Sequence, residues 1–128
     1  MRQAVATDKA PKAIGPYSQG IRAGNLLFVS GQVPIDPATG ALIEGDIAAQ
    51  THRVMRNLTA ILEAAGATMD DVLRCTVYLA DMNDFAAMND VYGSYFSQPA
   101  PARATIQAVR LPKDARVEID LIATLSNS

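Results

Sequence analysis

The chain has 128 residues, of which 49% are hydrophobic and 19% charged, and its net charge is −2. This length suits one domain, so we expect residues 1–128 to form a single unit. No apolar run approaches the roughly 20 residues of a membrane-spanning helix, and the N-terminal segment lacks the apolar stretch of a secretory signal. A slightly acidic chain without tryptophan is a poor match for a nucleic-acid-binding protein, which usually carries a basic surplus.

The cysteine and histidine content restricts the chemistry further. Cys75 is the only cysteine, so no internal disulfide or thiolate metal cluster is expected, and a reducing compartment such as the cytoplasm is indicated. Its place on the apolar face of a predicted strand favours a small buried residue over a nucleophile. His52 is the only histidine, and we expect it to be solvated on a predicted helix. The sequence predicts no metal site.

The first half of the chain predicts two strands and a long helix. Strands are expected over 17–22 and 26–34, joined by a turn at 23–25, and a short extra strand is expected near 41–45. Helical spacing of apolar residues then runs through 45–66, where Asp46 can cap the N-terminus and Gly66 can end the helix.

The second half predicts a strand, a helix and two strands. Residues 70–81 alternate apolar and polar side chains with a period of two, which is typical of a strand with one buried face. Helical spacing returns over 81–96, and two strands within 101–120 are joined by a turn near Pro112 and Lys113. The order predicts an α+β domain of two layers, with a mixed β-sheet and two helices on one face. The other face would have no cover within the chain, so we expect self-association through it.

Arg103 and Glu118 are charged residues in these otherwise apolar last strands. If the two strands pair with each other, both side chains lie on the same face with space for a small molecule between them. An ordinary ion pair, or two solvated residues, is the alternative interpretation. The functional interpretation is that Arg103 holds a carboxylate in two parallel hydrogen bonds, while Glu118 in a partly apolar cleft exchanges protons with water.

Several segments resemble the reactive intermediate deaminase family, also called RidA or YjgF-like. They are "IGPYSQG", "FVSGQVP" followed by "DPATG", "DFAAMNDVYGSYF" and "PARATIQAVRLPKDARVEID", in the family's order and with similar spacing. The resemblance implies a chorismate-mutase-like fold assembled as a homotrimer with clefts between subunits. It also implies roles for seven residues. Arg103 would bind the substrate carboxylate and Glu118 would activate water. The residues expected to line the pocket are Tyr17, Ser30, Gly31, Asn89 and Thr105, the last at a position where the family uses Thr or Cys.

The activity implied by this resemblance is hydrolysis of 2-aminoacrylate and 2-aminocrotonate, or of their imine tautomers. Pyridoxal-phosphate-dependent dehydratases release these compounds, and the products are 2-keto acids and ammonia. Because the imine is already electrophilic, neither a metal nor a bound cofactor is expected. Two alternatives stay open: a non-catalytic trimer that binds small ligands or regulates, and an RNA-directed translation inhibitor or endoribonuclease, which the acidic charge balance disfavours.

Overall fold

The computed structural model of the protein describes residues 1–126. Three strands precede the first helix: β1 (Arg2–Val5), β2 (Gly20–Ala23) and β3 (Leu26–Gln32). The hairpin of β2 and β3 was predicted, but β1 was not. Its four residues have no distinct periodicity, and they form a strand by pairing antiparallel with β2. The strand expected near 41–45 is wrong, because only an isolated bridge between Ile35 and Leu42 forms there.

Helix α1 (Ile47–Ala64) follows the prediction closely. The Asp46 carboxylate accepts a hydrogen bond from the Ala49 backbone N–H at 2.9 Å, which caps the N-terminus. Gly66 adopts a φ of 81° just beyond the helix, a conformation that glycine accepts without strain. The buried stripe of α1 packs on the sheet, with Val54, Leu58 and Ile61 all fully buried.

The remaining elements are β4 (Val72–Leu79), α2 (Phe85–Gly93), β5 (Ala102–Gln107) and β6 (Val117–Thr124). Three short 3-10 helices connect them: η1 (Met69–Asp71), η2 (Met82–Asp84) and η3 (Pro112–Asp114). Cys75 in β4 is fully buried, as predicted.

The strand order corrects the expected pairing of the last two strands. The sheet runs β1-β2-β3-β6-β4-β5, so β4 separates β5 from β6. β5 pairs parallel with β4, while β6 pairs antiparallel with both β3 and β4. β6 buries every second side chain, which suits the sheet centre, whereas β5 has no fully buried residue and lies at the edge. The predicted hairpin through Pro112 and Lys113 is therefore wrong.

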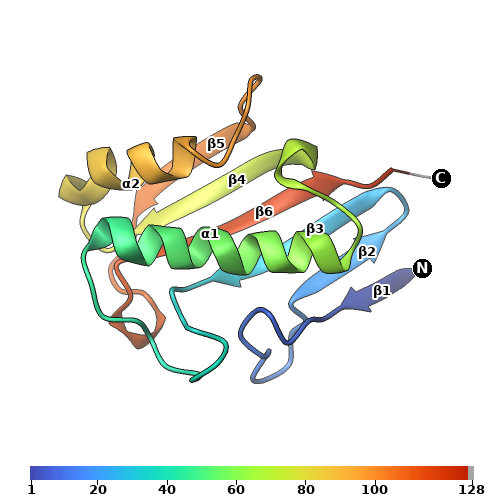
Figure 1. The fold of residues 1–128 in the computed structure, drawn as a ribbon, viewed down its shortest axis with the longest axis horizontal. Helices are drawn as coiled ribbons and strands as arrows, with labels where there is room; N and C mark the ends of the chain where they lie inside the picture. The colour runs from blue at the N-terminus through green and yellow to red at the C-terminus, as the bar shows by residue number, and fades with distance from the viewer. Residues whose placement is uncertain (127–128) are drawn as a thin grey trace.

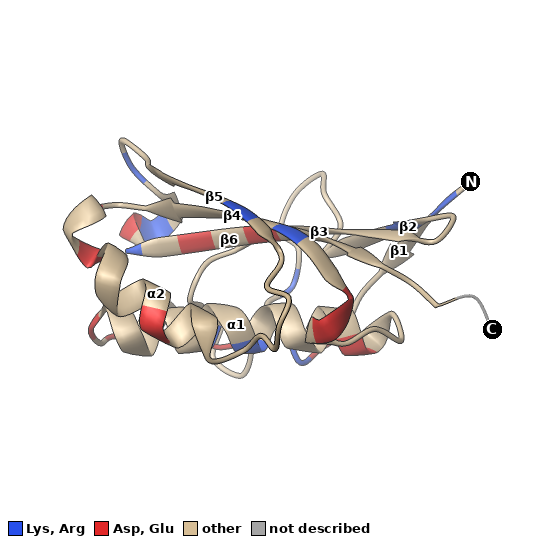
Figure 2. Cartoon of the chain, turned by 90° about the horizontal axis from the view of Figure 1, so that it is seen from above, with Lys and Arg blue, Asp and Glu red and all other residues tan. Residues whose placement is uncertain are grey.

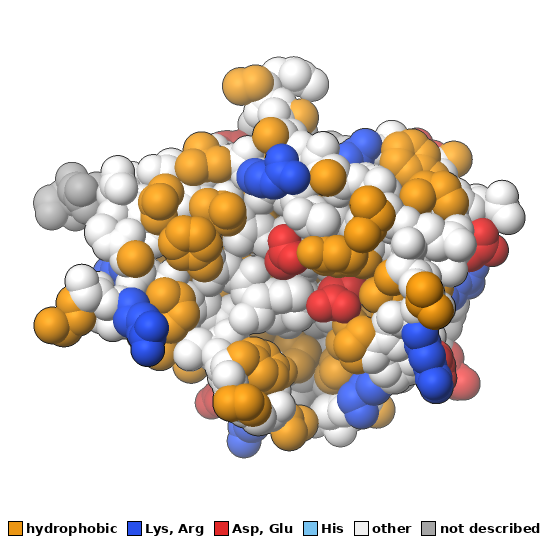
Figure 3. All heavy atoms as spheres, turned by 180° about the vertical axis from the view of Figure 1, so that it is seen from behind, with side chains coloured by type: hydrophobic (Ala, Val, Ile, Leu, Met, Phe, Trp, Pro, Cys, Tyr) orange, Lys and Arg blue, Asp and Glu red, His pale blue; other side chains and the backbone are white. Residues whose placement is uncertain are grey.

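The layers match the α+β prediction. Both helices cover the same face of the sheet, and the opposite face carries no helix from residues 1–126 (Figures 1 and 2). Seen from behind, this open face gathers hydrophobic side chains around a few charged ones (Figure 3). Phe28 of β3 and Ile106 of β5 are 43% and 48% exposed. No helix within residues 1–126 is long and apolar enough to cross a bilayer.

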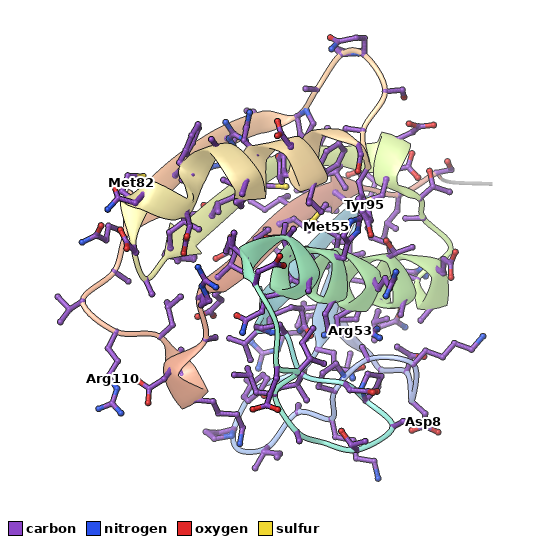
Figure 4. The ribbon with its side chains drawn as sticks, turned by 60° about the vertical axis from the view of Figure 1, so that its left-hand side comes forward. Asp8, Arg53, Met55, Met82, Tyr95 and Arg110 are labelled. Carbon is purple, nitrogen blue, oxygen red and sulfur yellow. The ribbon has the colours of Figure 1, made fainter. Side chains whose placement is uncertain are left out.

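His52 is an exception to the predicted solvated side chains of α1. It is half-buried, and its Nδ1 lies 2.9 Å from the hydroxyl of Tyr95, which lies where the two helices meet (Figure 4). The prediction was wrong because α2 covers this side of α1, which the periodicity of one helix does not reveal. His52 thus links α1 to the segment that directly follows α2, on the covered side of the sheet.

Candidate active site

A cavity of about 630 Å³ opens where β3 and β6 meet the N-terminal loop and η3. Tyr17, Ser30, Gly31 and Glu118 all contribute to its wall. These four were predicted as site residues from separate parts of the sequence, and the fold brings them together. Ile14, Val33 and Ile35 add an apolar lining.

A bulge in β3 shapes the floor of this cavity. Val29 pairs with Leu121 and Gln32 with Ile119, so β3 uses one more residue than β6 over the same stretch. The Ser30 N–H and hydroxyl both bond back to the loop, to the carbonyls of Gln19 at 2.9 Å and Ser18 at 2.5 Å.

Gly31 is required in this bulge because the Glu118 side chain occupies the space beside it. A Cβ at Gly31 would overlap Glu118 Oε2 and lie only 3.0 Å from its Cδ. The absence of a side chain at Gly31 therefore permits the observed position of the carboxylate.

Glu118 is half-buried and faces the open side of the sheet. Burial, and then the neighbouring Asp120 carboxylate, raise the pKa of Glu118 above its usual value. Asp120 is held in turn by the Tyr78 hydroxyl, which donates to its Oδ2 at 3.0 Å. Within residues 1–126, Glu118 accepts no hydrogen bond that would favour its ionised form. This environment suits a carboxyl group that gives and takes a proton.

Arg103 and Asn89 form a second cluster beneath α2. Arg103 Nη1 donates to Asn89 Oδ1 at 2.7 Å, and the guanidinium lies over the Tyr92 and Phe85 rings, 4.9 and 5.5 Å from their centroids. Asn89 and the two rings hold the guanidinium in one orientation while engaging only one of its nitrogens within residues 1–126. The Arg103 guanidinium therefore retains N–H groups that could bind a planar anion.

Thr105 belongs to this second cluster. It follows Arg103 by two residues on β5, and its hydroxyl is buried without a hydrogen-bond partner in the described chain. The Tyr92 hydroxyl is also buried without a hydrogen-bond partner in the described chain, and burial raises its pKa. These hydroxyls leave polar groups near Arg103 that the described residues do not satisfy.

The sheet separates the two clusters, which corrects the prediction that Arg103 and Glu118 share a face. Arg103 is in register with Cys75, whose side chain is buried under the helices, whereas Glu118 is in register with Tyr78 on the open face. The prediction failed because it assumed direct pairing of β5 with β6. A single chain therefore presents the arginine and the glutamate on opposite sides.

Two buried amides that the sequence analysis did not single out hold the cavity walls. Gln19 is 4% exposed; its Oε1 accepts from Thr7 N at 2.7 Å, and its Nε2 donates to the carbonyl of Pro11 at 2.7 Å. Asn57 of α1 is fully buried and donates to the carbonyls of Val33 and Ile35 at 3.3 and 3.0 Å.

Asn57 could have been found from the sequence. It lies three residues after Val54 and four before Ile61, so it is a polar side chain on the apolar stripe of the helix. Its Oδ1 also accepts two hydrogen bonds from Arg53, labelled in Figure 4, so all of its polar atoms are used. Within residues 1–126, no group of three His, Cys, Asp or Glu side chains is arranged to hold a metal ion.

Comparison with known proteins places this arrangement in a family. Residues 7–125 match the family described as Endoribonuclease L-PSP. A RutC family protein of Pyrococcus horikoshii is 56% identical over 123 residues, covering 96% of this chain and 98% of that one. The 2-iminobutanoate/2-iminopropanoate deaminase of Salmonella typhimurium is 44% identical, covering 96% and 98% of the two chains. The crystal structure of Escherichia coli TdcF with bound serine superposes with a TM-score of 0.92 at 41% identity, covering 97% and 99%.

The chain therefore belongs to the Endoribonuclease L-PSP family, which includes the RutC proteins and the reactive intermediate deaminases. The resemblance noted in the sequence is confirmed. Relatives at 44–45% identity carry the name of an imine deaminase or a reactive intermediate deaminase.

Proposed function

We propose that this protein hydrolyses 2-iminopropanoate and 2-iminobutanoate, or their enamine tautomers, to 2-keto acids and ammonia. The observation that carries the proposal is the half-buried Glu118 beside Gly31 in an open cavity, in a chain that separately holds Arg103 in a fixed orientation. The names of relatives at 44–45% identity support the same chemistry.

The site is completed between subunits in this proposal. Arg103 cannot reach the Glu118 cavity of its own chain through the sheet, so a neighbouring copy must supply it. The open face offers the surface for such a contact, because exposed Phe28 and Ile106 lie there without cover. A closed homotrimer would give every subunit the same two contacts and form three equivalent sites.

Arg103 of the neighbouring subunit binds the substrate carboxylate and fixes the imine carbon in the cavity. The Glu118 carboxylate takes a proton from a water molecule as the water oxygen bonds to the imine carbon, and the imine nitrogen gains that proton. In the resulting carbinolamine, Glu118 transfers the hydroxyl proton to the amine nitrogen, so that the C=O bond forms, the C–N bond breaks, ammonia leaves and the Glu118 carboxylate is regenerated. The Tyr17 hydroxyl, in the same cavity, supports the charge that develops on the oxygen.

This mechanism fits the chain better than nuclease chemistry does. The single histidine bonds to Tyr95 on the helix side of the sheet, away from the cavity, and the net charge of −2 gives little attraction for phosphates. The substrates proposed here would come from enzymes that eliminate water from hydroxy amino acids.

A subunit-mixing experiment tests both the activity and the intersubunit site. A dehydratase generates the enamine, semicarbazide traps the imine, and the fall in semicarbazone formation measures hydrolysis. We expect Arg103→Ala and Glu118→Gln each to lose activity as pure proteins while keeping the trimeric mass in light scattering. Co-refolded in equal amounts, they should recover about one quarter of the wild-type activity, because about one quarter of the sites receive both intact residues. No recovery on mixing would contradict the intersubunit site, and activity in either pure variant would contradict the assigned roles.

A further inference from the structure

Two of the three lysines in the sequence line the Glu118 cavity. Lys12 approaches from the N-terminal loop and Lys113 from η3, while Lys9 does not contribute to the wall. Among the lining residues that the structure describes, Glu118 is the only carboxylate. The cavity therefore carries a positive excess in a chain whose net charge is −2.

Neither lysine forms a salt bridge within residues 1–126 of one chain. Within residues 1–126, salt bridges join Arg110 to Asp114 and Arg116 to Asp84, and neither involves a lysine. The acid next in sequence to Lys113 is Asp114, and both of its oxygens accept from Arg110, at 2.6 and 3.0 Å. Lys113 is thus left without the nearest available counterion.

The proposed hydrolysis leaves both lysines without a role. The reaction needs one arginine to bind the α-carboxylate and one carboxyl group to activate water. Lys12 and Lys113 take part in neither step. In a single chain the cavity of about 630 Å³ is larger than a three- or four-carbon imino acid, and Lys12 and Lys113 line it together with Glu118. An ammonium group is a compact charge on a flexible stem, and it attracts a carboxylate without demanding one geometry.

We propose that the cavity accepts dicarboxylic 2-imino acids, the imines of four- and five-carbon acidic amino acids, with Lys12 and Lys113 binding the second carboxylate. This inference rests on the proposed deaminase function and specifies its substrate class. The reaction at the imine carbon is unchanged, and the lysines act on specificity. The reactions that supply such substrates are oxidations of acidic amino acids to their imines.

Substrate preference in paired variants tests the inference. An amino-acid oxidase converts aspartate or glutamate, and separately alanine or 2-aminobutyrate, to the imine in the presence of semicarbazide. The double variant Lys12→Gln with Lys113→Asn removes both charges, and asparagine tolerates the φ of 57° at position 113. Lys9→Gln is the matched control, because it removes a lysine that does not line the cavity.

We expect the double variant to lower the ratio of kcat/KM for dicarboxylic over monocarboxylic imines by about five- to tenfold, as loss of two exposed ion pairs implies. Lys9→Gln should leave the ratio at the wild-type value, and added salt should lower the wild-type ratio. An unchanged ratio in the double variant, or wild-type protein that hydrolyses only monocarboxylic imines, would overturn the inference while leaving the deaminase proposal in place.

A binding measurement keeps the inference testable if no imine is hydrolysed at all. Calorimetry with 2-oxoglutarate and 2-oxobutyrate compares a dicarboxylate with a monocarboxylate of related structure. Wild-type protein should bind 2-oxoglutarate about five- to tenfold more tightly, and the double variant should lose this difference. Equal affinities in the wild type would contradict a site for the second carboxylate.

Discussion

Replacing Gly31 with alanine adds one methyl group directly against the proposed catalytic carboxylate. The new Cβ would overlap Glu118 Oε2 and lie 3.0 Å from Cδ and 3.3 Å from Cγ. Gly31 does not have a positive φ, so alanine fits its backbone, and the three atoms nearest to the new Cβ all belong to Glu118.

The displacement follows from contact distances. Non-bonded carbon atoms prefer separations of about 3.5–4.0 Å, so Cδ must retreat by about 0.5–1 Å and the overlapped oxygen by more. A misplacement of about 1 Å in a catalytic group can reduce the rate by about 100-fold. Because Glu118 is a flexible side chain on the open face, we expect the free energy of unfolding to fall by only about 1 kcal/mol, the cost of a strained rotamer.

The assay is semicarbazide-competed imine hydrolysis, with kcat/KM compared between the wild type and Gly31→Ala. Gly93→Ala is a suitable control, since no atom lies within 4 Å of a Cβ built at the end of α2. We expect about 100-fold lower kcat/KM for Gly31→Ala, little change for Gly93→Ala, and the same mass for both by light scattering. Full activity of Gly31→Ala would contradict this role of Gly31, because it would mean that the observed carboxylate position is not the one used in the reaction.

Three further changes test the electrostatics and the support of the site. Glu118→Gln should be more stable than the wild type in urea at pH 7, and this difference in stability should vanish below about pH 4.3. The pKa of Glu118 is raised in the folded state, so the protonated carboxyl group stabilises the folded protein relative to the ionised one. This stabilisation of the wild type is lost as the pH rises through the folded-state pKa. A constant difference across pH would contradict the shift. Asp120→Asn should move the acid limb of kcat/KM to lower pH, because removing this carboxylate lowers the pKa of Glu118; an unmoved limb would show that another group controls it. Asn57→Ala should cost about 2–3 kcal/mol in urea unfolding and also reduce kcat/KM, since it leaves the carbonyls of Val33 and Ile35, in the cavity wall, without their donor. A loss of stability with unchanged kcat/KM would separate Asn57 from the site.

Local elements of this protein could be predicted because their causes are local. The Asp46 cap, the apolar stripe of α1 and the glycine that ends it lie within about twenty neighbouring residues, and the structure confirms all three. The alternation around Cys75 likewise identified β4 and the buried positions of Cys75, Val77 and Leu79, whereas Leu73, expected on the same face, is 48% exposed. The motifs that carry the family resemblance also contain the residues that lie in the Glu118 cavity and in the cluster around Arg103.

Which strands pair depends on interactions between segments that are distant in the sequence, and the local residue pattern does not show these interactions. A period of two tells which residues share a face, but it does not tell which strand lies alongside. β1 became visible only through its pairing with β2, and the link between His52 and Tyr95 only through the packing of the helices.

The placement of Arg103 and Glu118 shows the consequence for function. The local pattern was enough to place a guanidinium and a carboxyl group in two largely apolar strands and to predict which neighbours share their faces. The position of β4 between those strands, which puts the two groups on opposite sides of the sheet, became known from the folded chain. The physical reason is that β6, with a fully buried face, is most stable at the centre between two strands, whereas the more exposed β5 is accommodated at the edge.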